Sequence, residues 1–289
     1  MPLTVRHHAT VDEFLAAAGG FLEEHEAENN LLFGISSAIR ATPELFADEV
    51  PRFATVTDDA ERTVAASLRT PPHNQVLSWT DDMDAVDALA DAMQHEQLPG
   101  LLGPTGPAER FVARWTEATG QAGAVGVAER IFRLSRVIPP ARPAAGDWRF
   151  PEPRDRDLIA RWVIAFSEEA VPEAAPIPDP GDVADRWIAR AGRLGYLWLD
   201  GDAVVSMVGV SGDTPHGVRI GPVYTPPELR NRGYASSLTA AASADQLDRG
   251  RQFVFLFTDL ANPTSNKIYR AIGYEPVCDV DQYRFGAGA

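Results

Sequence analysis

One segment sets the interpretation of the whole chain: Val223-Tyr224-Thr225-Pro226-Pro227-Glu228-Leu229-Arg230-Asn231-Arg232-Gly233-Tyr234-Ala235. Its apolar start, its prolines and its glycine predict a strand, a short turn and the opening of a helix. The first N–H groups of a helix have no partner inside it, so they can bind an anion. Arg230 and Arg232 add positive charge, and the small residues Gly233 and Ala235 let a ligand approach the backbone. The segment therefore predicts a turn that binds a diphosphate.

Two common phosphate motifs do not fit this turn. A dinucleotide fingerprint needs Gly-x-Gly-x-x-Gly, and its first glycines are missing. A P-loop needs Gly-Lys-Ser/Thr after a longer glycine loop, and the lysine is missing. What remains is Arg-x-x-Gly-x-Ala over residues 230–235, a short pattern that an ordinary strand-turn-helix joint could also contain.

A second informative block follows the apolar run Phe253–Thr258, which predicts a buried strand. Asn262 is a good helix cap, Pro263 suits the first helical position, and Gly273 predicts the end of a helix of about three turns. The 3.6-residue period gives this helix one polar face that ends in a tyrosine, formed by Asn262, Ser265, Asn266 and Tyr269. Such a face is unusual for a purely structural helix.

Together the two blocks resemble the signatures of the GNAT superfamily, the acyl-CoA-dependent N-acyltransferases. The first is similar to the Arg/Gln-x-x-Gly-x-Gly/Ala loop that holds the diphosphate of acetyl-CoA in that family. The second is similar to the pattern Asn-x-x-Ala/Ser-x-x-x-Tyr-x-x-x-Gly-Phe/Tyr, with Asn262, Ser265, Tyr269, Gly273 and Tyr274 in place. The resemblance covers the chain from about Asp147 onward. It implies an α/β (α+β) fold in which helices flank a mixed, mostly antiparallel twisted sheet.

The N-terminal half repeats the same order of elements without the loop. After the predicted strand 75–79 comes Thr80-Asp81-Asp82-Met83-Asp84, which has no arginine or glycine and would repel a diphosphate. Asp81 or Asp82 is better explained as a helix cap. We therefore expect two tandem GNAT-like domains: a degenerate domain over 1–137, a proline-rich linker over 138–146 and an acetyltransferase domain over 147–289. An unrelated α/β domain in the first half is the alternative.

The patterns predict the following elements. In the first half we expect helices at 12–24, 30–39, 84–94 and 107–119, strands at 53–56, 63–68, 75–79 and 98–102, and closing strands within 124–137. In the second half we expect helices at 157–170, 181–192, 235–249 and 263–272, a proline-rich loop at 172–180, strands at 195–199, 203–210, 218–224 and 253–258, and two short strands within 275–285.

The resemblance also implies roles for single residues. The cofactor-binding set would be Val223, Tyr224, Thr225, Arg230, Asn231, Arg232, Gly233, Tyr234, Ala235, Ser236, Asn262, Ser265 and Tyr269. Two of these would be catalytic: a backbone N–H near Val223 would polarise the thioester carbonyl, and the Tyr269 phenol would protonate the departing thiolate. Simpler roles stay open for five of these residues. They are a surface ion pair for Arg232, packing for Tyr234, capping alone for Asn262, an ordinary paired strand for Val223 and a hydrogen-bonded core tyrosine for Tyr269.

The general base is left open by the sequence. Glu168 and Glu169 end the first helix of the second half, and Asp213 and His216 lie in a loop between two strands. A chain of water molecules is the remaining possibility. Direct attack by an amine requires no enzyme nucleophile, so Cys278 is not needed.

Composition narrows the function classes. The 289 residues carry a formal net charge of −15, which argues against nucleic acid and mildly favours a cationic amine. The sequence has no apolar run of membrane-spanning length, no apolar signal core near Met1 and one cysteine. We expect a cytoplasmic N-acetyltransferase without a metal, a monomer or dimer, acting on a small-molecule or peptide amine. A non-catalytic acyl-CoA sensor is the alternative, and the acceptor and the acyl-chain length stay open.

Overall fold

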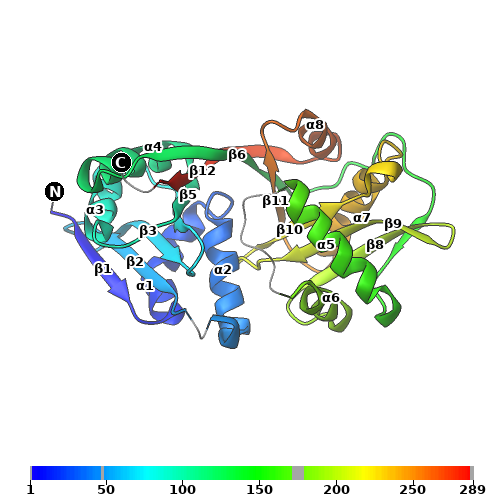
Figure 1. Cartoon of the computed structure of the whole chain (residues 1–289), viewed down its shortest axis with the longest axis horizontal. Helices are drawn as coiled ribbons and strands as arrows, with labels where there is room; N and C mark the ends of the chain where they lie inside the picture. The colour runs from blue at the N-terminus through cyan, green and yellow to red at the C-terminus, as the bar shows by residue number, and fades with distance from the viewer. Residues whose placement is uncertain (1, 47–48, 171–178, 287–289) are drawn as a thin grey trace. The chain divides into compact units, whose positions relative to one another are not determined.

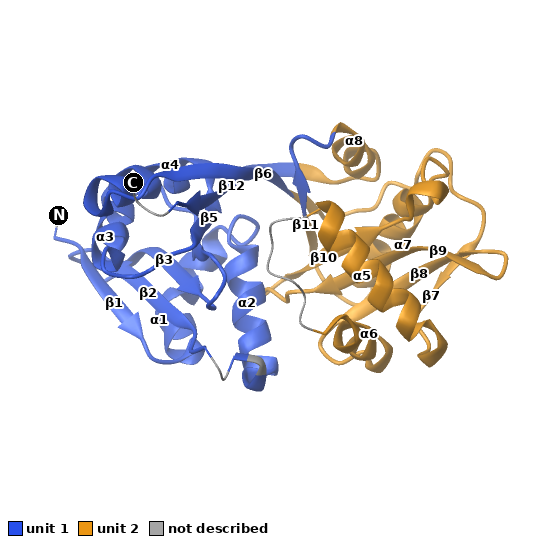
Figure 2. Ribbon diagram, in the orientation of Figure 1, with its two compact units in different colours: residues 1–131, 257–262, 276–289 blue, residues 132–256, 263–275 orange. Residues whose placement is uncertain are grey.

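The computed structural model describes residues 2–46, 49–170 and 179–286. They form two compact units, shown in Figures 1 and 2. Unit 1 contains Met1–Ile131, Phe257–Asn262 and Pro276–Ala289, and unit 2 contains Phe132–Leu256 and Pro263–Glu275. The expected domain limits, 1–137 and 147–289, therefore do not coincide with the compact units.

Unit 1 is a sheet covered by four helices. Its strands lie in the order β1-β2-β3-β4-β5-β12, and all described neighbours are antiparallel except the parallel pair β4 and β5. The strands are β1 (Thr4–His8), β2 (Arg52–Thr57), β3 (Thr63–Arg69), β4 (Gln75–Leu77), β5 (Gly100–Pro104) and β12 (Glu275–Phe285). The helices are α1 (Val11–Glu24), α2 (Asn30–Ala41), α3 (Met83–Met93) and α4 (Thr105–Thr119).

Unit 2 repeats this plan. Its strands lie in the order β7-β8-β9-β10-β11, antiparallel except for the parallel pair β10 and β11. The strands are β7 (Asp147–Arg149), β8 (Leu194–Asp200), β9 (Ala203–Ser211), β10 (Gly217–Tyr224) and β11 (Phe253–Asp259). The helices are α5 (Arg156–Ala170), α6 (Pro180–Ala189), α7 (Tyr234–Asp248) and α8 (Pro263–Ala271).

Each unit takes part of its structure from the other half of the sequence. The last strand, β12, pairs with β5 and so completes unit 1, from Val280 opposite Pro104 to Arg284 opposite Gly100. The end of β6 (Gly123–Leu134) supplies Phe132 and Leu134 to the core of unit 2. A split of the chain at the linker assumes that strands pair only within their own half of the sequence. The pairing of β12 with β5 does not fit that assumption.

The expectation of two short strands within 275–285 and of several closing strands within 124–137 is wrong. Residues 275–285 form the single strand β12, and residues 123–134 form the single strand β6. The physical reason is visible in β12, where no glycine or asparagine interrupts the run after Pro276 to form a turn. The other predicted helices and strands are confirmed within a few residues, whereas β1 and β7 were not expected. Most of the predicted loop 172–180 lies outside the described residues.

Two facing glycines let α6 pack closely on the sheet of unit 2. Gly195 on β8 lies opposite Gly209 on β9. A β-carbon added to Gly195 would lie 2.4 Å from the Trp187 ring, and one added to Gly209 would lie 2.5 Å from it. The buried indole of Trp187 therefore occupies the space that two side chains would otherwise fill.

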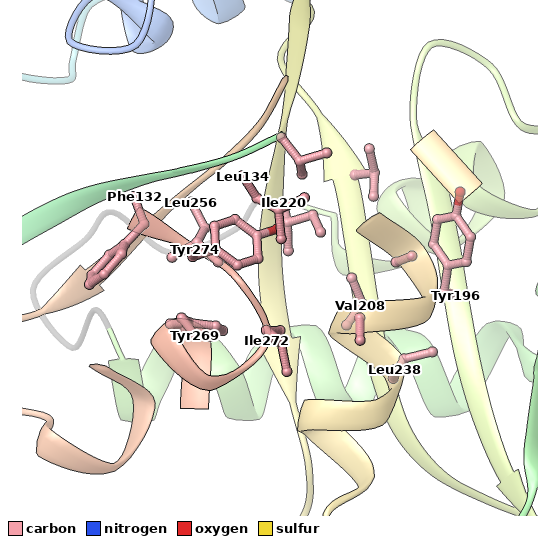
Figure 3. Close-up of a cluster of buried hydrophobic side chains, with 14 of the residues drawn as sticks. Phe132, Leu134, Tyr196, Val208, Ile220, Leu238, Leu256, Tyr269, Ile272 and Tyr274 are labelled. Carbon is pink, nitrogen blue, oxygen red and sulfur yellow. The ribbon is translucent and has the colours of Figure 1, made fainter. Parts of the chain in front are cut away.

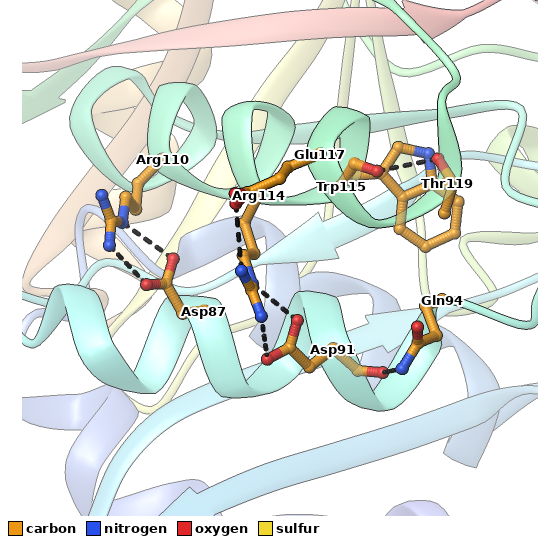
Figure 4. Close-up of polar contacts among 8 residues, drawn as sticks. All are labelled: Asp87, Asp91, Gln94, Arg110, Arg114, Trp115, Glu117 and Thr119. Carbon is orange, nitrogen blue, oxygen red and sulfur yellow. Dashed lines mark hydrogen bonds and ion pairs between the residues drawn. The ribbon is translucent and has the colours of Figure 1, made fainter.

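Ion pairs link the two helices on one face of unit 1 (Figure 4). Arg110 of α4 binds Asp87 of α3, with Nε 2.8 Å from Oδ1. One turn further on, Arg114 binds Asp91 through two nitrogens, at 2.6 and 2.8 Å. All four side chains are partly exposed, so these pairs set the register of the helices more than they stabilise the fold.

We predict that Gly209→Ala destabilises the protein by about 1–3 kcal/mol, because the new methyl group overpacks this site. Besides the Trp187 ring, it would meet the Gly221 carbonyl oxygen and Pro222 Cδ, both at 2.9 Å. Thermal unfolding measures the effect. The control is Gly20→Ala in the exposed part of α1, where nothing lies within 4 Å of the added carbon. That variant should be neutral or slightly stabilised, and equal melting temperatures for both variants would contradict the packing argument.

Candidate functional site

The candidate site begins where β10 parts from β11. The two strands pair in parallel over three residue pairs, and the last of these is Arg219 opposite Phe255. Strand β10 nevertheless continues to Tyr224, and its pairing with β9 resumes at Val223 opposite Val208 after a bulge. The final part of β10 therefore has a partner strand on one edge only. Backbone groups on the other edge are available to an extended ligand.

A buried serine fixes the end of β10. The Ser206 hydroxyl on β9 lies 3.0 Å from the Tyr224 carbonyl oxygen and 2.8 Å from the Thr225 hydroxyl. Ser206, Tyr224 and Thr225 are all buried. Sequence reasoning missed Ser206, because one serine in an apolar strand gives no signal of a contact with a residue almost twenty positions away. It fixes where β10 ends and the turn begins.

The turn itself has the backbone conformation of an anion-binding loop. Asn231 and Gly233 both have left-handed backbone, with φ of 63° and 83°, on either side of Arg232. Asparagine and glycine tolerate this conformation best. Ser237 N donates the first α-helical bond of α7 to Gly233 O at 2.9 Å. The N–H groups of Tyr234, Ala235 and Ser236 precede that bond, so the helix does not use them.

Arg230 is held within the protein. Its Nε donates to the Thr225 carbonyl oxygen at 2.9 Å, and its Nη2 lies 2.6 Å from Glu169 Oε2 on α5. The Glu169 carboxylate raises the pKa of Arg230. These bonds tie the turn to α5 and to the end of β10. Arg230 therefore braces the loop, and its charge is already partly balanced.

Tyr234 and Arg232 lie at the start of α7. The buried Tyr234 donates its hydroxyl hydrogen to Asp200 at the end of β8. That carboxylate raises the pKa of Tyr234, and the nearby Arg232 guanidinium opposes the shift. The packing role left open for Tyr234 is confirmed by this burial. Arg232 is exposed, and its guanidinium lies close to the Tyr234 hydroxyl.

Tyr269 lies in the core of unit 2, as Figure 3 shows. Its ring packs edge-on against Tyr274 at 6.0 Å between ring centres. Tyr274 is in turn fixed by its hydroxyl, 2.8 Å from the Ser243 hydroxyl on α7. Burial raises the pKa of Tyr269 to about 12. The phenol is therefore protonated throughout the physiological range, as a proton donor must be.

The other predicted residues of this block lie at the two ends of α8. Asn262 directly precedes α8, which begins at Pro263 as predicted, and Ser265 lies in its first turn. Ser265 is half-buried and Asn262 is exposed. Gly273 follows the helix with a left-handed φ of 106°.

Two of the four candidate bases are already paired with arginines. Glu169 binds Arg230, and Asp213 binds Arg251. Glu168 is exposed on the last turn of α5. His216 lies in the loop before β10, where its carbonyl oxygen accepts hydrogen bonds from Gln252 N and Phe253 N. The carboxylates of Glu169 and Asp213 are therefore already engaged by arginines, which disfavours them as bases.

Known proteins share this architecture. Residues 202–284 match the family model described as FR47-like protein. A tandem GNAT protein from the clavulanic acid biosynthesis pathway superposes with a TM-score of 0.58 at 15% identity, covering 100% of this chain and 99% of that one. An acetyltransferase from the GNAT family of Colwellia psychrerythraea gives 0.56 at 10%, covering 98% and 100%. A Drosophila protein gives 0.65 at 14%, covering 99% of both chains. This chain has the tandem GNAT fold.

None of the curated proteins matches the sequence significantly. Over the described ranges, no helix combines the length and apolar character needed to cross a bilayer.

In the described part of unit 1, the corresponding helix start differs from the turn at 230–236. Asp82 caps α3, and its carboxylate accepts from Ala85 N at 3.0 Å, as one of the two predicted alternatives required. The capping carboxylate uses an N–H group that an anion would need and adds negative charge. In this tandem GNAT fold the two units therefore differ at the very place where a diphosphate would bind.

The reactivity of Cys278 tests how deeply its thiol is buried. It lies on β12, and burial raises the pKa of its thiol to about 12. A raised thiol pKa means less thiolate at a given pH, by about a thousandfold relative to a free cysteine. We therefore predict very slow alkylation by iodoacetamide at about pH 8, followed by intact mass. The urea-unfolded chain is the control and should react fast. Equal rates for folded and unfolded chains would contradict the burial of this thiol.

Proposed function

We propose that the protein is an acetyl-CoA-dependent N-acetyltransferase in which an amine attacks the thioester directly. The single observation that carries the proposal is the parting of β10 from β11 immediately before a turn with unused N–H groups. Residues 220–224 have one free edge, and residues 231–236 combine two left-handed residues with a helix start. A ligand with a peptide-like arm and a diphosphate matches both features.

The N–H groups of Tyr234, Ala235 and Ser236 would hold the diphosphate of CoA, and Gly233 would let it approach the backbone. Arg232 would add charge from the exposed side of the turn. Arg230 would act indirectly by holding the turn to Glu169 and Thr225. The pantetheine arm would then lie along the free edge of β10, near Val223 to Thr225.

The bulge in β10 supports a role for the backbone near Val223. It interrupts the regular pairing with β9 between Ile220 and Val223, so N–H groups there need not all point at β9. One of these groups would donate to the carbonyl oxygen of the thioester and stabilise the negative charge that develops on it.

The bond changes then follow directly. The amine nitrogen forms a bond to the carbonyl carbon, the carbon–sulfur bond breaks, and the thiolate takes a proton from the Tyr269 phenol. The nitrogen of the adduct loses its extra proton as the amide forms, and a proton from solvent restores the phenol. The ammonium proton leaves beforehand to a base or to water. Of the four candidates, Glu169 and Asp213 already bind arginines, so Glu168, His216 or water is the proposed base. A small-molecule or peptide amine is the proposed acceptor, and the net charge of −15 favours its approach.

Release of CoA thiol from acetyl-CoA in the presence of an amine panel tests the proposal. The full chain should release thiol with at least one amine, and acetylated amine should appear by mass spectrometry. Gly233→Val is the inactive control, because a β-branched residue does not tolerate the φ of 83° found there. Tight binding of acetyl-CoA without turnover on any amine would favour the sensor instead. Absence of CoA binding would refute the site.

We predict that Tyr269→Phe lowers kcat by about 10- to 100-fold with little change in KM for acetyl-CoA. Because the Tyr269 pKa is raised to about 12, its acid form persists through alkaline pH. The wild-type rate should therefore show no loss assignable to this phenol below about pH 10. The pH profile of both proteins measures this. A wild-type alkaline decline near pH 9 that disappears in the variant would contradict the assignment.

A further inference from the structure

The segment between the two halves of the sequence is anchored to unit 2. Ala144 N donates to the buried Ser237 hydroxyl of α7 at 2.9 Å. One residue later, the Ala145 carbonyl oxygen accepts from Trp198 Nε1 at 2.9 Å. Gly146 follows with a left-handed φ of 104° and lies against the Leu199 carbonyl. These contacts hold residues 142–146 in one place beside the first turn of α7, although their composition predicted only a linker.

This segment borders the diphosphate turn. A β-carbon built on Gly233 would lie 3.5 Å from the Arg142 carbonyl oxygen and 3.8 Å from the Ala144 β-carbon. The Arg142 carbonyl oxygen therefore lies close to Gly233, the residue that directly precedes α7. An arginine side chain spans more than this distance, so its guanidinium can reach an anion bound at the turn.

The charges around the turn make Arg142 distinctive. Arg230 is bound to Glu169 and Thr225, and Arg232 shares a corner with Tyr234 and Asp200. Arg142 is exposed and has no hydrogen bond or ion pair with any residue that the structure describes. In a chain with a net charge of −15, an arginine next to this turn that has no carboxylate partner among the described residues is a cation available to an anionic ligand.

We propose that Arg142 is a further cofactor-binding residue, whose guanidinium pairs with the diphosphate of CoA at the turn. This rests on the proposed function. The hydrogen bonds of Ala144 and Ala145 hold the backbone beside the turn, so the Arg142 side chain starts from a fixed position close to the proposed ligand. The segment joining the halves is then part of the binding site, and its length and sequence are constrained by the ligand as well as by the connection.

Calorimetric titration of the full chain with CoA and with dephospho-CoA tests this inference. Both ligands carry the diphosphate, and only CoA carries the 3′-phosphate. Arg142→Ala should weaken both by about fivefold, the scale of a partly exposed ionic contact. Arg142→Glu should weaken both further, and Arg142→Lys should retain part of the affinity because it keeps the charge. The matched control is Arg161→Ala, which removes an exposed arginine from α5 and should bind like wild type.

The outcomes separate the two proposals. Wild-type protein that binds neither ligand refutes the proposed function itself. Wild-type binding with unchanged affinity in Arg142→Ala and Arg142→Glu overturns the role of Arg142 and leaves the function standing. A loss seen with CoA and not with dephospho-CoA also overturns the assignment, because the residue would then contact the 3′-phosphate. Equal losses in Arg142→Ala and Arg161→Ala would show a general charge effect and overturn it as well. Melting temperatures of all variants should match wild type.

Discussion

The proposed chemistry depends on where the pairing between β10 and β11 stops. After Arg219 and Phe255 the two parallel strands no longer bind each other, while β10 runs on for five residues against β9. A strand edge inside a sheet is normally satisfied by its neighbour. Among the described strands, residues 220–224 have no partner on the β11 side, and the Ser206 contacts hold the end of β10 at the turn. In the proposed function, this edge and the N–H groups of residues 234–236 bind two parts of one ligand.

The two units show how the same fold either keeps or loses such a surface. Both contain one parallel strand pair within an otherwise antiparallel set, β4 with β5 and β10 with β11. In unit 2 the following helix starts at a left-handed glycine, with no side chain bound to its first N–H groups. In unit 1 the helix starts at Asp82, whose carboxylate fills that place. The two helix starts therefore differ in their capping residue, Gly233 in unit 2 and Asp82 in unit 1.

Local features of the fold were predictable from the sequence, because they depend on residues close together in the chain. The start of α8 at Pro263 and the cap at Asp82 follow from short-range stereochemistry. The pairing of β12 with β5 joins residues about 180 positions apart, and no periodicity encodes a partner at that distance. The proline-rich composition of 138–146 correctly excluded a helix or strand, yet it could not indicate that Ala144 and Ala145 bind unit 2.

The candidate site followed the same rule. The turn was found because glycine and arginine at fixed spacing have local meaning, but the partner of Arg230 was not, since Glu169 lies 61 positions away. A crystal structure of the protein with bound CoA tests the central claim most directly. The account predicts diphosphate oxygens within hydrogen-bond distance of the N–H groups of residues 234–236, with the pantetheine arm along β10. Diphosphate bound elsewhere, with this turn unoccupied and β10 uncovered, would contradict it.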